Sequence, residues 1–265
     1  MSQKFEIGAY YHNFNEIDVT GIDHVTFLKT TSEEWKAFHK KHPQIDVSLA
    51  FDKKTVQPGL KRVTLMAHKG MHLEKECQTL LDCGFQVRVA LPCSPELLNS
   101  FDIRALSSLD VKIDLMAFDY VHPTTSSRTN FHSVLFAWEG PSVMQTFQFL
   151  HDHGIALNRV NLGLTSWGIL FKNVSPGMYS TGYAQPFEGE QLKNPQMSST
   201  EIDNYLEAHP AAKVFYTSLQ GCFQSFIYNS ETGDWISFDD ALTLQSKIEW
   251  ARHQGLNGAF LYQAL

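Results

Sequence analysis

The hydrophobic pattern of the chain alternates between short apolar runs and amphipathic segments with a helical period, which predicts strands that alternate with helices. One run, residues 110–120, is too continuous for a strand with one solvated face and too short for an ordinary helix. It predicts a buried parallel strand that leaves the core at Asp119 and Tyr120. In barrels and open α/β sheets, ligands bind at this carboxyl end of the strands.

Seven further apolar runs are typical of strands, and they cover residues 5–11, 24–28, 45–51, 63–67, 85–91, 160–164 and 258–262. Amphipathic segments separate most of these runs. Thr31 and Glu34 have the spacing of a capping box, and Ser94-Pro95 is a typical helix start. Eight strands that alternate with helices predict a (β/α)8 TIM barrel, which is an α/β fold.

Three more helices are predicted from apolar residues at helical spacing. The first covers residues 71–82 and ends before Gly84. The second follows Gly140-Pro141 and directs four apolar side chains inward, namely Val143, Met144, Phe147 and Leu150. The last is capped by Ser237 and ends at Gly255.

A change of pattern after the seventh strand predicts an insertion. Ser198 and Glu201 have the spacing of a capping box for a short helix, and two strand-like runs with a turn follow this helix. We therefore expect residues 173–234 to form a small α+β insertion. The barrel is then made by residues 1–172 and 235–265.

The link between the third and fourth strands is unusually short. Residues 52–62 contain a Pro-Gly turn and no amphipathic face, so we expect no helix there. A missing helix would leave apolar surface uncovered, and such patches usually mark contact sites. This predicts self-association or a protein partner near Val56, Leu60, Leu73 and Leu80.

Composition narrows the classes of function. With 265 residues, of which 43% are hydrophobic and 18% are charged, the chain is long enough to bury a large core. A formal net charge of −7 argues against a nucleic-acid partner, because the phosphate backbone requires a basic surface. The chain has no run of about eighteen apolar residues, so we expect no membrane span.

The N-terminus enters strand-like sequence without the basic and apolar segments of a signal peptide. We therefore expect a cytoplasmic protein, or an extracellular one if a signal peptide has been removed. The cysteines have no zinc-like spacing, and we expect reduced, buried thiols at Cys77, Cys83, Cys93 and Cys222.

A metal site is considered at one pair of histidines. The chain has 12 histidines, which are scattered along it. His68 and His72 are four residues apart, but Glu74 is the one carboxylate near them at ligand spacing. We therefore expect no metal and no cofactor.

Four blocks of sequence carry a resemblance to a known family. They are Asp114-Leu-Met-Ala-Phe-Asp-Tyr120, Thr129-Asn-Phe-His-Ser-Val-Leu-Phe136, Val160-Asn-Leu-Gly-Leu-Thr-Ser-Trp-Gly168, and Trp235-Ile-Ser-Phe-Asp-Asp240 through Tyr262. In this order and spacing the chain resembles glycoside hydrolase family 18, the chitinases and chitinase-like lectins. The resemblance implies a (β/α)8 barrel, often with an α+β insertion after the seventh strand.

The same resemblance implies a catalytic signature that this chain lacks. The family has Asp-x-x-Asp-x-Asp-x-Glu at the end of the fourth strand, where the Glu protonates the glycosidic oxygen and the N-acetyl group of the substrate attacks the sugar. If residues 61–68 form that strand, His68 stands where the acid is expected and Met66 where its supporting Asp is expected. Phe118 also replaces a family Tyr, and Tyr262 a family Trp. Proton donation to the leaving group typically accelerates the reaction about 10²–10⁴-fold. Because the acid that donates this proton is missing, we expect no catalytic residue.

Three hypotheses follow. The leading one is non-catalytic binding of an N-acetylglucosamine-type glycan or chitooligosaccharide, which the resemblance to the chitinase-like lectins implies. The candidate residues lie at the strand ends and are Asp119, Tyr120, Phe118, Tyr11, Trp167 and Tyr262. Their rings either stack on sugars or fill the top layer of the barrel, and both roles stay open. The second hypothesis is a vestigial pocket in a protein-interaction or structural module, and the third is an altered hydrolase that uses Asp119 or Asp52.

Overall fold

The structure is a computed structural model that describes residues 4–12, 17–51, 59–137, 140–188, 190–219 and 222–263. Contacts divide the chain into two compact units. The barrel unit comprises Met1–Met116, Met144–Leu164 and Trp250–Leu265. The second unit comprises Ala117–Val143 and Thr165–Glu249.

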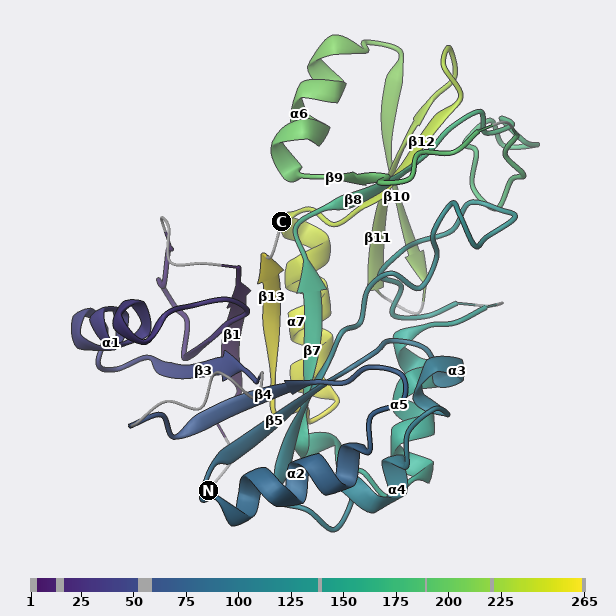
Figure 1. The fold of residues 1–265 in the computed structure, drawn as a ribbon. Coiled ribbons are helices and arrows are strands. Elements are labelled where there is room, and N and C mark those ends of the chain that lie inside the picture. Colours follow the sequence, from purple (N-terminus) through teal and green to yellow (C-terminus); the bar gives the residue numbers. More distant parts are fainter. Residues whose placement is uncertain are drawn as a thin grey trace. The chain divides into compact units, whose positions relative to one another are not determined.

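Eight strands close into a barrel in the order β1-β13-β7-β6-β5-β4-β3-β2. They are β1 (Glu6–Tyr11), β2 (His24–Phe27), β3 (Asp46–Ala50), β4 (Arg62–Met66), β5 (Gln86–Leu91), β6 (Val111–Leu115), β7 (Val160–Thr165) and β13 (Gly258–Gln263). Parallel pairing joins β1 to β13, so strands from the two ends of the chain lie side by side (Figure 1). The predicted (β/α)8 barrel is confirmed.

The strands alternate between apolar residues that face outward and polar residues that face the lumen. In β5, Arg88 stands between two buried valines. Tyr10 of β1 donates a hydrogen bond of 2.6 Å to Asp114 of β6. Because β13 and β7 separate these strands in the sheet, the two side chains meet across the lumen. The strand predicted within residues 110–120 is therefore buried on both faces, but one of those faces is polar.

The helices of the described residues are α1 (Ser32–Lys41), α2 (Leu73–Asp82), α3 (Pro95–Leu98), α4 (Ile103–Leu106), α5 (Val143–Asp152), the 3₁₀ helix η1 (Leu157–Arg159), α6 (Ser199–Ala208) and α7 (Ala241–His253). The capping boxes predicted at Thr31 and Ser198 are both formed. Gly84 follows α2 with a φ of 83°, as a helix-ending glycine does. None of these helices is long and apolar enough to cross a membrane.

Two local predictions about helices are wrong. Met144 reaches solvent instead of the core, with 42% of its surface exposed. Ser237 does not cap α7, because it lies inside β12 (Asp234–Phe238). Asp240 caps this helix, since its carboxylate accepts from the Thr243 backbone N–H at 2.9 Å, and its own N–H donates to the Thr243 hydroxyl at 2.9 Å.

The apolar surface predicted near the link between β3 and β4 is covered by the chain itself. Leu60, Leu73 and Leu80 are 8%, 3% and 4% exposed. The helix α2 turns its buried face, which includes Leu73 and Leu80, toward β5. The prediction that these leucines form an exposed patch is therefore wrong. Val56 and Asp52 of the link lie outside the described residues.

The cysteines divide between core and surface. Cys77 and Cys93 are buried and form no disulfide, as predicted, and burial raises the pKa of the Cys77 thiol to about 12. Cys83 is free but exposed, because it lies in the turn after α2. The side chain of Cys222 lies outside the described part.

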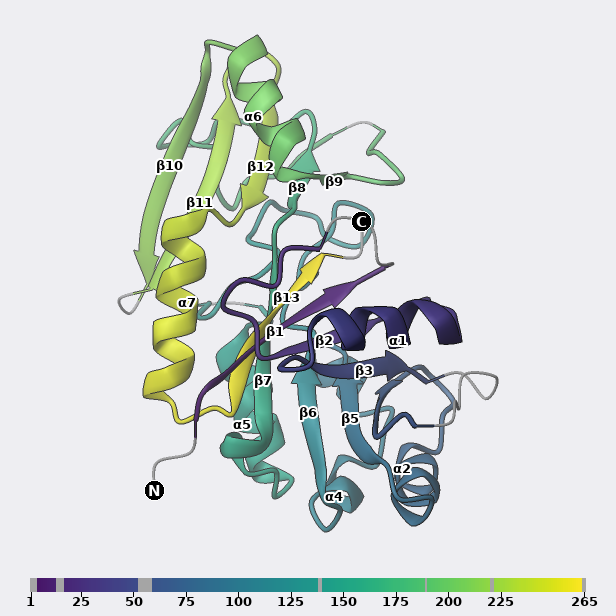
Figure 2. The same ribbon diagram turned by 90° about the vertical axis from the view of Figure 1, so that its left-hand side faces the viewer.

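The second unit contains a sheet in the order β10-β11-β12-β8-β9 with antiparallel pairs. Its remaining strands are β8 (Gly168–Phe171), β9 (Gln196–Met197), β10 (Ala212–Leu219) and β11 (Cys222–Asn229). The helix α6 covers one face of this sheet (Figure 2), where Ile202 packs with Leu170, Ile227 and Ile236. The α+β character of this region agrees with its sequence pattern, and the bounds 173–234 stay a prediction.

Candidate functional site

The candidate sugar-binding residues follow the carboxyl ends of barrel strands, where (β/α)8 proteins build their sites. Tyr11 ends β1, and Tyr262 is the last but one residue of β13. Asp119 and Trp167 lie in the segments directly after β6 and β7. Each unit therefore carries its own candidates, Tyr11 and Tyr262 in the barrel unit and Asp119 and Trp167 in the second unit.

In the second unit, three of the four candidates are buried. Phe118, Tyr120 and Trp167 are 7%, 8% and 2% exposed. Phe118 and Trp167 pack edge to face, with ring centroids 5.2 Å apart and planes at 75°. These rings fill the interior and offer little free face to a sugar.

Asp119 differs from its neighbours because it reaches solvent. Its φ of 62° lies in the left-handed region, where a non-glycine residue is strained and is often found at functional sites. Partial burial raises the pKa of Asp119 above its usual value, although the charge of His122 and the polar indole of Trp167 act in the opposite direction. The carboxylate of Asp119 is therefore accessible from solvent and can accept hydrogen bonds.

In the barrel unit, Tyr262 is more accessible than Tyr11. Tyr11 is 8% exposed, and its hydroxyl donates to the backbone carbonyl of Asp18 at 2.9 Å. Tyr262 is half-buried and stacks on Tyr10, with ring centroids 5.6 Å apart and planes at 27°. The packing supports one face of the Tyr262 ring while the side chain still reaches solvent.

The fourth strand, β4, carries hydroxyl and thioether groups where the family resemblance implies carboxylates. Thr64 directs its Oγ1 into the lumen, 2.7 Å from the hydroxyl of Ser48 and 3.4 Å from that of Thr26. Met66 ends the strand half-buried, and His68 follows it in an exposed position. The lumen-facing positions of β4 therefore offer a neutral hydroxyl and a thioether, and His68 lies outside the strand in solvent.

A buried carboxylate does lie in the lumen, but on β6. Asp114 is 0% exposed and accepts hydrogen bonds from the Tyr10 hydroxyl at 2.6 Å, Arg88 at 3.0 Å and Asn161 at 2.5 Å. Burial and the charge of Asp114 raise the pKa of Tyr10 well above its usual range. Since donors from three strands occupy its oxygens, Asp114 supports the barrel and is not free to meet a substrate.

Sequence reasoning missed a buried polar cluster next to the Asp119 segment. Tyr120 donates its backbone N–H to the carbonyl of His132 at 2.9 Å. The imidazole of His132 lies 2.7 Å from the hydroxyl of Ser237 and 3.2 Å from that of Thr165. Burial lowers the pKa of His132 to about 4, so this ring is neutral at pH 7. His132 stood in a block quoted for the resemblance, but its partner Ser237 is 105 residues away.

A buried ion pair joins α7 to the segment that contains His132 and Ser133. Lys247 lies 2.6 Å from both carboxylate oxygens of Asp239, and it donates to the carbonyl and the hydroxyl of Ser133 at 2.7 and 2.8 Å. Both charged side chains are 1% exposed. Burial is the largest single influence on Asp239 and raises its pKa, but the charge of Lys247 and the hydrogen bonds from Lys247 and Ser133 act together in the opposite direction. The pKa of Asp239 is therefore lowered.

The described residues contain no group of three or more His, Cys, Asp or Glu placed to hold a metal ion. His72 immediately precedes α2, and the exposed His68 ring lies 3.3 Å from a neighbouring backbone carbonyl. The geometry therefore gives the pair His68 and His72 no third ligand within the described part of the chain.

The residues from β4 onward match a known family. The model described as "Glycosyl hydrolases family 18" matches residues 66–264. The chain belongs to glycosyl hydrolases family 18. The match begins at Met66, the last residue of β4, and includes the four blocks of sequence that carry the resemblance.

Curated relatives of this family 18 chain are chitinases. It is 23% identical over 255 residues to a probable endochitinase of the Orgyia pseudotsugata multicapsid polyhedrosis virus, an alignment that covers 90% of the chain and 45% of the viral protein. It is 22% identical over 185 residues to chitinase 1 of Aphanocladium album, which covers 68% of the chain and 41% of that protein. The family 18 chain thus spans less than half the length of these relatives.

Solved structures show the same fold as this family 18 chain. A variant of the class V chitinase from Nicotiana tobaccum, in complex with NAG4, has a TM-score of 0.77 at 19% identity and covers 97% of this chain and 93% of its own. YKL-39, solved in the presence of chitooligosaccharides, has a TM-score of 0.74 at 16% identity, with coverage of 97% and 92%. At these identities the likeness shows the barrel fold.

Proposed function

We propose that this family 18 chain is a chitinase-like protein that binds an N-acetylglucosamine-type glycan without hydrolysing it, through residues at the carboxyl ends of its barrel strands. The observation that carries this proposal is the composition of β4. Its lumen-facing positions hold Thr64 and Met66, and the exposed His68 follows. Glycoside hydrolysis requires a proton donor at the leaving oxygen, usually a carboxylic acid, and β4 supplies none.

Two side chains support glycan binding. Tyr262 is half-buried and stacks on Tyr10, and an aromatic ring that still reaches solvent suits the apolar face of a sugar ring. Asp119 presents a carboxylate that reaches solvent and can accept hydrogen bonds from sugar hydroxyl groups. Chitooligosaccharides or NAG4 accompany two of the structural relatives, which favours the same class of ligand for this chain.

Isothermal titration with the tetrasaccharide GlcNAc4 tests the binding. We expect saturable binding with a Kd in the micromolar to millimolar range, which corresponds to roughly −4 to −8 kcal/mol. Tyr262→Ala and Asp119→Ala should each weaken binding by about tenfold or more, as residues that anchor a ligand do. Tyr179→Ala is the matched control, because Tyr179 is 84% exposed and does not follow a barrel strand. An equal loss in Tyr179→Ala would contradict the assignment of the site.

A fluorogenic chitobioside tests the absence of hydrolysis. The wild-type protein should release no fluorophore above the uncatalysed rate, because a donor on β4 is missing. Turnover that disappears in Asp119→Asn would overturn this part of the proposal. It would favour an altered hydrolase in which the raised pKa of Asp119 lets it act as the acid.

The burial of Phe118, Tyr11 and Trp167 favours a second candidate function. If these rings only fill space, the pocket is vestigial and the barrel serves as an interaction or structural module. A folded protein that shows no saturable heat with GlcNAc4 at millimolar concentration would support this function over the first.

A further inference from the structure

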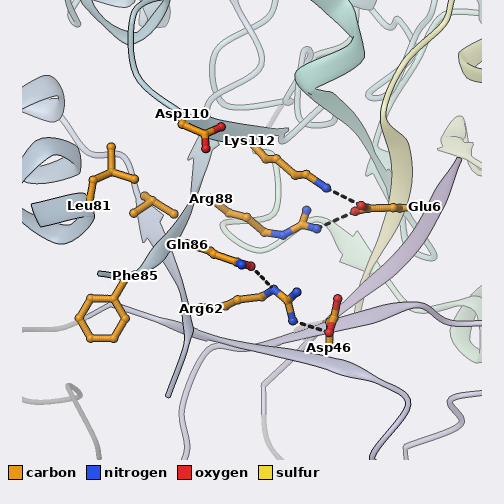
Figure 3. A pocket seen from close by; sticks show the side chains of 10 residues that line it. Glu6, Asp46, Arg62, Leu81, Phe85, Gln86, Arg88, Asp110 and Lys112 are labelled. Carbon is orange, nitrogen blue, oxygen red and sulfur yellow. Dashed lines mark hydrogen bonds and ion pairs between the residues drawn. The ribbon is translucent and has the colours of Figure 1, made fainter. Parts of the chain in front are cut away.

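A pocket of about 330 Å³ opens at the amino-terminal ends of the barrel strands, the end opposite to the strand ends discussed above. This volume lies at the lower end of the range for small-molecule sites, about 300–1,000 Å³. Figure 3 shows polar side chains from five strands converging there, namely Glu6, Asp46, Arg62, Gln86, Arg88 and Lys112. In most (β/α)8 barrels branched apolar residues fill the interior, so this polar opening is unusual.

The cationic side of the pocket keeps unused hydrogen-bond donors. Lys112 contacts Glu6, which leaves two of its three ammonium N–H groups without a partner among the described residues. Arg62 uses Nε on Gln86 at 2.7 Å and one terminal nitrogen on Asp46, so in the described part its other terminal nitrogen is free. Donors grouped in this way suit a carboxylate.

Asp110 supplies a carboxylate to the same pocket. It directly precedes β6, is exposed, and lines the same pocket. Within the described ranges it makes no hydrogen bond or ion pair, and its interaction with Arg159 is electrostatic and longer in range. Arg159 uses its own guanidinium on backbone carbonyls, including those of Val111 at 3.0 Å and Leu109 at 2.5 Å. The carboxylate of Asp110 is therefore available to an ammonium group.

The charges that line the pocket cancel. Three cations and three carboxylates contribute, and they are Arg62, Arg88, Lys112, Glu6, Asp46 and Asp110. A ligand with a net charge would leave that charge uncompensated, whereas a zwitterion would not. Leu81 and Phe85 add apolar surface on the side of the pocket away from Glu6 and Asp46 (Figure 3).

We propose that this pocket binds a small zwitterion with one ammonium group, one carboxylate and an apolar side chain, of which an α-amino acid such as leucine is the simplest form. Asp110 receives the ammonium group. Lys112 and Arg62 receive the carboxylate, and Leu81 and Phe85 cover the apolar side chain. The site is independent of glycan binding, because it uses the other end of the barrel strands.

Isothermal titration of the intact protein with three probes that share the branched side chain of leucine tests this site. The probes are L-leucine, 4-methylpentanoate, which lacks the ammonium group, and 3-methylbutylamine, which lacks the carboxylate. Leucine should bind saturably at millimolar concentration or below. Each analogue should bind at least about tenfold more weakly, because it leaves one pole of the pocket without a partner. Absence of leucine binding, or equal binding of an analogue, would overturn the proposal.

Variants locate the binding. Asp110→Asn should weaken leucine binding by about tenfold or more and leave the weak binding of 4-methylpentanoate unchanged. The control is Asp82→Asn, because Asp82 is an exposed carboxylate on α2 that does not line the pocket. Full leucine affinity in Asp110→Asn would overturn the assignment. GlcNAc4 titrations of both variants should match the wild type, which separates this proposal from the proposed glycan function.

Discussion

Replacing Lys247 by Met tests whether the buried ion pair holds the second unit together next to the Asp119 segment. Methionine is flexible and of similar length, so it fills the space without the ammonium charge. The change removes hydrogen bonds of 2.6–2.8 Å to Asp239 and Ser133. It leaves the Asp239 carboxylate 1% exposed, with the Ser133 hydroxyl as a remaining donor at 2.5 Å.

The expected loss is about 3–5 kcal/mol in the free energy of unfolding at pH 7, because the change strands a buried charge. This is a large share of the free energy of unfolding of a typical domain, which is roughly 5–15 kcal/mol. The double variant Lys247→Met with Asp239→Asn should regain much of the loss, since no unpaired charge remains.

The pH dependence gives a second signature of the Lys247 change. Without the cation, burial raises the folded-state pKa of Asp239 above its unfolded value. A carboxyl group whose pKa is higher in the folded state than in the unfolded state stabilises the fold at a pH below its unfolded-state pKa. This stabilisation is lost as the pH rises through the folded-state pKa. The gap between Lys247→Met and the wild type should therefore be largest near pH 7 and shrink toward about pH 4.

Guanidinium unfolding curves followed by tryptophan fluorescence measure these differences. Lys172→Met is the matched control, because its pair with Asp234 is longer, at 3.5 Å, and Lys172 is 40% exposed. That control should lose about 1 kcal/mol or less. A loss below about 1 kcal/mol in Lys247→Met, or a double variant as unstable as the single one, would refute the reasoning.

Three other predictions use the same structure. Stability should fall as the pH drops from 6.5 toward 4, because burial lowers the pKa of His132 to about 4 and the imidazole of the unfolded chain binds a proton first. The full effect is worth about 3 kcal/mol in the free energy of unfolding. Urea unfolding should show a flatter dependence of stability on pH in His132→Gln than in the wild type. Gly8→Ala should destabilise the barrel by about 1–3 kcal/mol or more, since the Cβ of the new alanine would lie 2.1 Å from the ring of His24. Thermal unfolding should show that the double variant Gly8→Ala with His24→Ala regains stability. Chitobioside assays of His68→Ala and Asp119→Asn should both equal the uncatalysed rate, and a difference between them would reveal a donor.

Local signals were sufficient to predict most elements and the barrel. The capping boxes at Thr31 and Ser198 join residues three positions apart, so the surrounding fold does not alter them. Ser237 shows the limit of such signals. A serine before a helix is a good cap, but pairing of β12 with β11 and β8 extends the strand through Ser237, and Asp240 takes the capping role.

The sequence by itself determined that eight strands alternate with helices, because strand length, helical period and caps are properties of neighbouring residues. Only the tertiary structure decided which face of each strand meets the lumen, since alternation along β6 separates Lys112 from Ile113 without saying which one points inward. Closure of the barrel brings Tyr10 to Asp114, 104 residues away, and folding of the second unit brings His132 to Ser237. Such contacts depend on the whole chain, so no local pattern could show that Asp114 is already occupied, or that Trp167 is buried while Asp119 reaches solvent.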